Sequence, residues 1–129
     1  MRIRPSDRSS TILALRTDLK LDVARTGYLS VVSARGEIDI ATAGRAEAAL
    51  DAARGATVLV LDLRGVEFID TSGLRLIIQE RRRAEADGYR FAVVRGPHNV
   101  QRLLEIAGFP CEDSLFVEDP AELTDGAGP

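Results

Sequence analysis

The clearest pattern in the chain is an almost continuous apolar run that leads through a short polar connection into a helical repeat. Residues 57–63 are nearly all apolar, which is typical of a strand covered on both faces of a sheet. After the connection, Leu74, Ile77 and Ile78 recur at helical spacing on one side. We therefore predict a central strand over 57–63 and a helix from 71 to about 87.

Similar patterns predict the remaining elements. Apolar and polar residues alternate over 19–23, and a turn at 25–27 leads to a second strand, so the two are expected to pair as an antiparallel hairpin. A stripe of alanines at helical spacing predicts a helix that lies close to the sheet. The predicted strands are 19–23, 28–34, 57–63, 91–94 and 115–117, and the predicted helices are 42–53, 71–87 and a segment between Gly96 and Gly108, with one helical turn at 120–123.

The order of these elements predicts an α/β fold. Strands that alternate with helices are typical of a mostly parallel sheet with right-handed crossovers, and the opening hairpin makes the sheet mixed. A chain of 129 residues has the size of one domain with one core. We expect a flexible N-terminal extension over 1–16, a folded domain over 17–119 and a C-terminal tail over 120–129.

Charge and composition narrow the classes of partner. The net charge of −3 provides no basic field for nucleic acid, and no apolar run approaches the roughly 18 residues that span a bilayer. The charged N-terminus is not followed by an apolar segment, so no signal peptide is predicted, and Cys111 alone cannot form an internal disulfide. A cytoplasmic protein that binds neither nucleic acid nor membrane is expected. The helix from residue 71 is expected to expose a charged side formed by Arg75, Glu80, Arg82 and Arg83.

Recognisable catalytic motifs are missing from the sequence. There is no phosphate-binding loop, no dinucleotide-binding motif and no nucleophile elbow. His98 is the sole histidine and is expected at a helix start, while Cys111 lacks companion ligands at zinc spacing. Asp39, Asp62 and Asp70 are compatible with a divalent ion, but solvated carboxylates or helix caps are the simpler interpretation. We expect no enzyme activity, no catalytic residues, no metal, no cofactor and no small-molecule substrate.

The polar connection at 70–73 contains the one chemically suggestive group of residues. Asp70, Thr71 and Ser72 are all residue types that favour the N-cap of a helix. Two hydroxyls are therefore expected at the positive end of a helix, where an added phosphate would be tolerated. A plain helix cap is the alternative interpretation of the same residues. Gly73 is expected to permit close backbone approach, either to the sheet or to a partner.

Four segments together resemble the STAS domain, and more narrowly the bacterial anti-sigma factor antagonists. Each segment alone is weak, but the four occur in order at family spacing over about residues 19–118. They are Gly36-Glu37-Ile38-Asp39, the apolar strand with Leu61-Asp62-Leu63, the turn Phe68-Ile69-Asp70-Thr71-Ser72-Gly73-Leu74, and Pro97 followed by the segment 102–109.

The resemblance implies a regulatory binding module. In this family the unphosphorylated protein binds an anti-sigma factor that is also a serine kinase, which frees a sigma factor. Phosphorylation ends the interaction, and a metal-dependent phosphatase reverses it. The acceptor follows the aspartate directly, which places it on Thr71 where the family usually has serine, with Ser72 as the fallback acceptor.

We expect the partner surface at the loop 39–42, the turn 70–73 and the exposed side of the following helix. Both turns should lie at the carboxyl ends of neighbouring strands, where α/β sheets bind ligands. This surface comprises Glu37, Asp39, Thr42, Asp70, Thr71, Ser72, Gly73 and Arg75. The alternative function is a STAS accessory or scaffold subunit of a transporter or of a stressosome-like complex.

Overall fold

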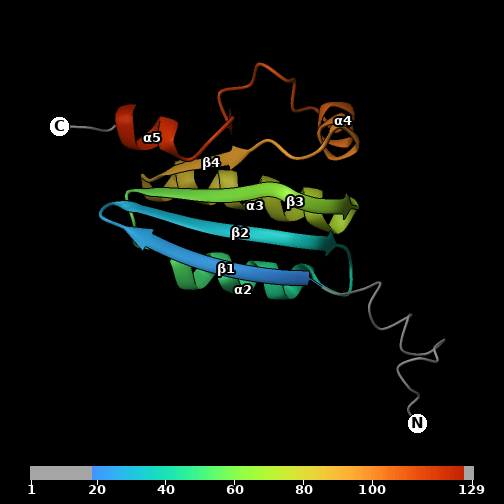
Figure 1. The fold of residues 1–129 in the computed structure, drawn as a ribbon, viewed down its shortest axis with the longest axis horizontal. Helices are drawn as coiled ribbons and strands as arrows, with labels where there is room; N and C mark the ends of the chain where they lie inside the picture. The colour runs from blue at the N-terminus through green and yellow to red at the C-terminus, as the bar shows by residue number, and fades with distance from the viewer. Residues whose placement is uncertain (1–18, 127–129) are drawn as a thin grey trace, which may run out of the picture.

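The long strand β3 (Val58–Ile69) forms the middle of a five-stranded sheet in the computed structural model, which describes residues 19–126 (Figure 1). The strand order is β1-β2-β3-β4-β5; β1 and β2 pair antiparallel, and every other pair is parallel. The predicted mixed, mostly parallel sheet with an opening hairpin is therefore confirmed. The other elements are β1 (Leu19–Thr26), β2 (Leu29–Ile38), α2 (Ala43–Ala53), α3 (Thr71–Asp87), β4 (Arg90–Val94), α4 (His98–Ile106), β5 (Phe116–Val117) and α5 (Ala121–Gly126).

The two faces of the sheet carry cores of different size. Leu59, Leu61 and Leu63 of β3 belong to the larger core, to which α2, α3 and α4 all contribute. Figure 1 shows α2 behind β1 and β2, and α3 behind β3 and β4. Val58 and Val60 point the other way, as the alternation of a strand requires, into a smaller core that includes Leu123 of α5. The nearly unbroken apolar run of β3 is thus explained by cover on both faces.

The predicted ends of β2 and β3 were too early. β3 continues to Ile69 and β2 to Ile38, beyond the predicted ends at 63 and 34. The pairing between them shifts twice, once between Ser33 and Arg35 and once between Gly36 and Glu37, because β3 contributes an extra residue at each place. Such bulges interrupt the alternation of apolar and polar residues, so the pattern fades although the strand continues.

The helix ends agree well with the sequence signals. The carboxylate of Asp70 accepts a hydrogen bond of 2.8 Å from the amide of Ser72 and so caps α3. Gly88 adopts the left-handed conformation with φ of 82° directly after the helix, as expected of a glycine in that position. The alanine stripe of α2 faces the sheet as predicted, with Ala46 and Ala53 fully buried.

Glu80 was predicted to be exposed on α3, and this prediction was wrong. Its side chain is only 3% exposed and accepts hydrogen bonds of 3.2 Å and 2.8 Å from Nε and Nη2 of Arg54. The hydroxyl of Tyr89 also donates to it. Hydrogen bonding to Glu80 raises the pKa of the Arg54 guanidinium, and burial together with the bond to Glu80 raises the pKa of Tyr89. The rest of the predicted charged side is confirmed, because Arg75, Arg82 and Arg83 are exposed.

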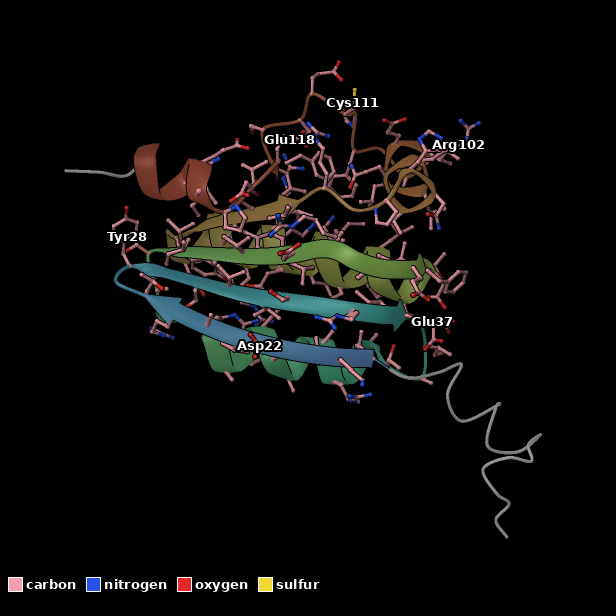
Figure 2. The ribbon with its side chains drawn as sticks, in the orientation of Figure 1. Asp22, Tyr28, Glu37, Arg102, Cys111 and Glu118 are labelled. Atoms are coloured by element: carbon pink, nitrogen blue, oxygen red, sulfur yellow. The ribbon has the colours of Figure 1, made fainter. Side chains whose placement is uncertain are left out.

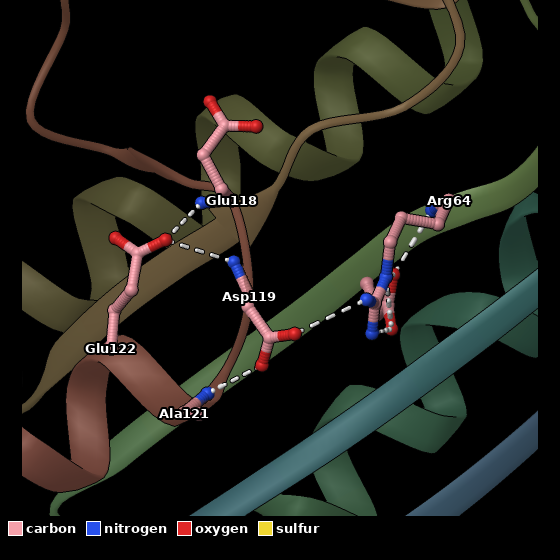
Figure 3. A network of polar contacts seen from close by, with 6 residues as sticks. Arg64, Glu118, Asp119, Ala121 and Glu122 are labelled. Atoms are coloured by element: carbon pink, nitrogen blue, oxygen red, sulfur yellow. Dashed lines mark hydrogen bonds and ion pairs between the residues drawn. The ribbon is translucent and has the colours of Figure 1, made fainter.

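The segment after β5 is held against the sheet by a capped helix rather than by a single turn. The carboxylate of Glu122 accepts from the amides of Glu118 and Asp119, and Asp119 accepts from Ala121 and pairs with Arg64 at 3.6 Å (Figure 3). Reciprocal contacts of this kind satisfy the free amides at a helix start. The predicted extension over 1–16 lies outside the described residues. Among residues 19–126, no helix is long and apolar enough to cross a bilayer.

Candidate functional site

Two turns lie side by side at one edge of the sheet. The amide of Asp70, after β3, donates a hydrogen bond of 3.1 Å to the carbonyl of Ile38, at the end of β2. The two strands are parallel, so their carboxyl ends meet at the same edge. The turns at 39–42 and 70–73 therefore form one surface, as the sequence predicted. In α/β sheets this edge is the usual place for ligands and partners.

The first turn is fixed by its own side chains. The carboxylate of Asp39 accepts hydrogen bonds from the amides of Ala41 at 3.0 Å and Thr42 at 3.1 Å. The hydroxyl of Thr42 accepts from the amide of Asp39 at 3.0 Å and donates to the carbonyl of Glu37 at 2.7 Å. Thr42 is only 2% exposed, so it shapes the turn from within, whereas Asp39 is half-buried and reaches the surface.

The second turn presents its two hydroxyls differently. Thr71 is exposed in the first turn of α3, directly after the capping Asp70. Ser72 is half-buried and lines a hollow of about 270 Å³ between α2 and α3, together with Arg75 and Gln79. A hydroxyl that must enter the active site of another protein has to be exposed, and Thr71 meets this requirement better than Ser72.

Gly73 brings the start of α3 onto the sheet. A Cβ atom at this position would lie 2.3 Å from Cγ1 of Ile69 and 3.1 Å from Cγ2 of Ile38. The first separation would force Ile69 to move and the second is tight, so glycine allows the closest packing here. Of the two roles left open by the sequence, the close approach is to the sheet.

The acidic residues near the strand ends have structural partners. Asp70 caps α3, which confirms the cap interpretation for this residue, whereas Asp39 accepts backbone hydrogen bonds within its own turn and caps no helix. Asp62 lies on the face of β3 opposite the large core and binds Arg64 through both oxygens, at 3.1 Å and 2.8 Å. Burial raises the pKa of Asp62, but the hydrogen bonds and the charge of Arg64 outweigh it and leave that pKa below its ordinary value. Within residues 19–126, no three acidic, histidine or cysteine side chains gather as a metal site would require.

His98 and Cys111 are the two remaining side chains for which the sequence predicted no catalytic or metal-binding role. His98 is exposed and is the first residue of α4, as predicted. Cys111 is exposed, and its hydrogen bond to Glu112 raises the pKa of the thiol.

Sequence reasoning missed two large apolar side chains at the same edge. Ile40 lies in the turn after β2, and Phe68 lies near the end of β3, where it pairs with Glu37. Both are exposed. A signal for Ile40 was present, because it is a large apolar residue in a turn between Asp39 and Thr42. The usual alternation of a strand, however, assigns Phe68 to the buried side with Val66.

Comparison with solved structures finds the same fold in proteins of different function. An anti-sigma factor antagonist from Mycobacterium paratuberculosis is 29% identical over 84% of this chain and 93% of that chain, with a TM-score of 0.68. The phosphorylated form of the Bacillus cell fate determinant SpoIIAA is 20% identical, over 83% of this chain and 98% of that one, with a TM-score of 0.65. The murine anion transporter Slc26a9 is 14% identical, over 91% of this chain and 24% of that chain, with a TM-score of 0.69.

No protein with a curated description matches the chain. The family model of the STAS domain does match, over residues 20–118, which cover the five described strands except Leu19 and the whole surface described above. The sequence resemblance is thereby confirmed. The chain belongs to the STAS domain family.

Proposed function

We propose that the chain is an anti-sigma factor antagonist. In its unphosphorylated form it binds an anti-sigma factor with serine kinase activity and so releases a sigma factor. The observation that carries the proposal is the exposed Thr71 behind the capping Asp70, next to the Asp39 turn. Similarity to the mycobacterial antagonist, at 29% identity over most of both chains, supports it.

Phosphorylation of Thr71 is the proposed off-switch. At the start of α3 a phosphate gains about 0.3–1 kcal/mol from the helix dipole, so the fold should tolerate it. Opposite Thr71 a bound kinase must place its nucleotide and its general base, because phosphoryl transfer requires both there. A charge near −2 at about 6 Å from one carboxylate costs roughly 1.4–5.5 kcal/mol for effective dielectric constants of about 80 to 20. The modification therefore weakens binding and leaves the fold intact.

Removal of the phosphate completes the cycle. We propose that a metal-dependent phosphatase performs this step on the same exposed Thr71. The surface that contacts the kinase comprises Glu37, Asp39, Asp70, Ser72 and Arg75 around the acceptor. Thr42 and Gly73 belong to it as buried supports of the two turns.

The test is a binding and labelling experiment with the purified anti-sigma factor kinase from the same cell. Incubation with ATP should place phosphate on Thr71, which phosphopeptide mapping detects, and should lower the affinity at least tenfold. Thr71→Ala should bind in the presence of ATP as tightly as the unmodified parent, and Thr71→Ser should accept phosphate at least as fast because the crowding methyl group is absent. Phosphate on Ser72 instead would refute the assignment of the acceptor.

A second candidate function is an accessory or scaffold subunit. The fold similarity to part of the anion transporter Slc26a9 favours it. Under this alternative the chain would not bind an anti-sigma factor kinase, so the same binding measurement separates the two functions.

A further inference from the structure

The edge that carries the two turns also exposes two large apolar side chains. Ile40 is 85% exposed, and Phe68 is 47% exposed. Single exposed apolar residues are common, so exposure alone carries little weight. The position of Phe68, however, has a specific structural cause.

A bulge turns Phe68 outward. In an unbroken strand Val66 and Phe68 would face the same side. Gly36 of β2 pairs with Val66 but the next residue, Glu37, pairs with Phe68, so Glu67 is an extra residue. Val66 and Ile69 are both buried, and Phe68 between them is left on the outer side. Bulges commonly redirect side chains next to functional sites, and this one exposes an aromatic ring beside the turn 70–73.

Carboxylates flank both apolar side chains. Phe68 follows the exposed Glu67 in β3 and lies across from Glu37 in β2. Figure 2 shows Glu37 at the end of β2, far from Tyr28 at the opposite end of the sheet. Ile40 directly follows Asp39. This part of the edge therefore combines exposed apolar area with negative charge.

We propose that Phe68 and Ile40 are the apolar anchors that the anti-sigma factor kinase buries, in a non-polar recess bordered by its own lysines or arginines. The proposal rests on the proposed function and extends the contact surface beyond the residues predicted from the sequence. An aromatic ring and a large aliphatic side chain surrounded by charge have the composition of an interface hot spot with a polar rim.

The charge pattern of the partner must differ along this edge. Beside Glu37 and Glu67 it is basic, which complements the carboxylates and speeds association. Opposite Thr71 it holds a nucleotide and a general base, so an added phosphate is repelled there. The anchors and the switch thus contribute separately to the affinity: the apolar contact holds the complex, and the phosphate opposes it.

The experiment measures the affinity of full-length variants for the purified kinase by titration calorimetry. Phe68→Ala and Ile40→Ala should each weaken binding at least ~10-fold, mainly through faster dissociation. Phe68→Leu, which keeps an apolar side chain, should retain most of the affinity. The matched control is Ile106→Ala, an exposed isoleucine at the end of α4, which should change the affinity less than twofold.

A second measurement probes the basic border. Glu67→Gln should slow association at low salt and make the affinity less dependent on salt concentration, because one charge of the rim is lost. Circular dichroism and the melting temperature of each variant should match the parent, which separates a lost contact from a lost fold.

Three outcomes would overturn the inference, and they differ in meaning. If Phe68→Ala and Ile40→Ala bind the kinase as tightly as the parent, the two side chains are not part of the contact, and the proposed function is unaffected. If the parent chain does not bind the kinase, both the proposed function and the contact through Phe68 and Ile40 are refuted. A variant that abolishes self-association in sedimentation, without altering kinase binding, would assign the two side chains to contacts between copies of this chain.

Discussion

Replacement of Glu80 by glutamine tests the buried polar cluster under α3. The new side chain would have nearly the same shape, but it would lack the charge that holds two hydrogen bonds from Arg54 and one from Tyr89. An amide oxygen in the place of Oε2 can still accept from Nε of Arg54 and from Tyr89, but the NH₂ group in the place of Oε1 would face Nη2 of Arg54, donor against donor. Glu80→Gln is therefore expected to destabilise the fold while leaving the surface of the two turns unchanged.

The size of the effect follows from the exposure of the partners. A hydrogen bond to a buried charged group contributes about 1.5–3 kcal/mol, and removal of one partner of a fully buried pair costs about 3–5 kcal/mol. The side chain of Arg54 is 21% exposed and also pairs with Asp51, so it can turn to water and to that carboxylate. We therefore expect a loss of about 2–3 kcal/mol, at the lower end of these ranges.

The assay is reversible urea unfolding at pH 7, supported by thermal melting. A loss of about 2–3 kcal/mol corresponds to a melting temperature lower by about 6–18 °C for a domain of this size. The control is Glu85→Gln on the same helix. Glu85 is exposed, and its i,i+4 ion pair with Arg81 is long, at 3.9 Å. Such pairs contribute about 0.3–0.5 kcal/mol. If Glu80→Gln were as mild as Glu85→Gln, the buried cluster would not stabilise the fold as argued.

Two further predictions concern the packing and the charges of the sheet. Gly73→Ala should destabilise the fold by about 1–3 kcal/mol in urea unfolding, because its Cβ would overlap Ile69, and Ile69→Val should recover part of the loss; an unchanged stability would mean that the helix start shifts freely. Arg64→Gln should lower the free energy of unfolding by about 0.5–1.5 kcal/mol near pH 7, a small loss because Arg64 is half-exposed and screened by water. This loss should disappear in acid. The direction of this pH dependence follows from the lowered pKa of Asp62. The ionised carboxylate stabilises the fold above its ordinary pKa of 3.8, and this stabilisation is lost as the pH falls through the lower pKa of the folded state. A loss of stability in Arg64→Gln that does not change with pH would contradict the pairing.

The sequence was informative where a local signal decides the structure. The start of α3 follows from the capping residue Asp70, and its end follows from Gly88 in the left-handed conformation. The parallel direction of the strands after the opening hairpin follows from the alternation of apolar runs with helical repeats, whereas their spatial order is a finding of the structure. The two turns lie at one edge because β2 and β3 are adjacent and parallel.

The features that could not be predicted depend on contacts between distant residues. Glu80 has the sequence appearance of a solvated helix residue, and only the approach of Arg54 and Tyr89 makes its burial favourable. The outward position of Phe68 depends on the pairing register of β3 with β2, which no single strand specifies. The burial of Thr42 results from a turn whose hydrogen bonds close over its own hydroxyl.

Because Gly73 has no side chain, it should also influence the rate at which a partner binds the surface of the two turns. Because the first turn of α3 rests directly on Ile69 and Ile38, the backbone around Thr71 is supported by the core instead of by a free loop. A partner therefore meets a preformed surface and loses little free energy in ordering it. Under the proposed function, association should then approach rigid-body docking, with a rate set by diffusion and charge, and a phosphate on Thr71 should shorten the lifetime of the complex without any change of shape.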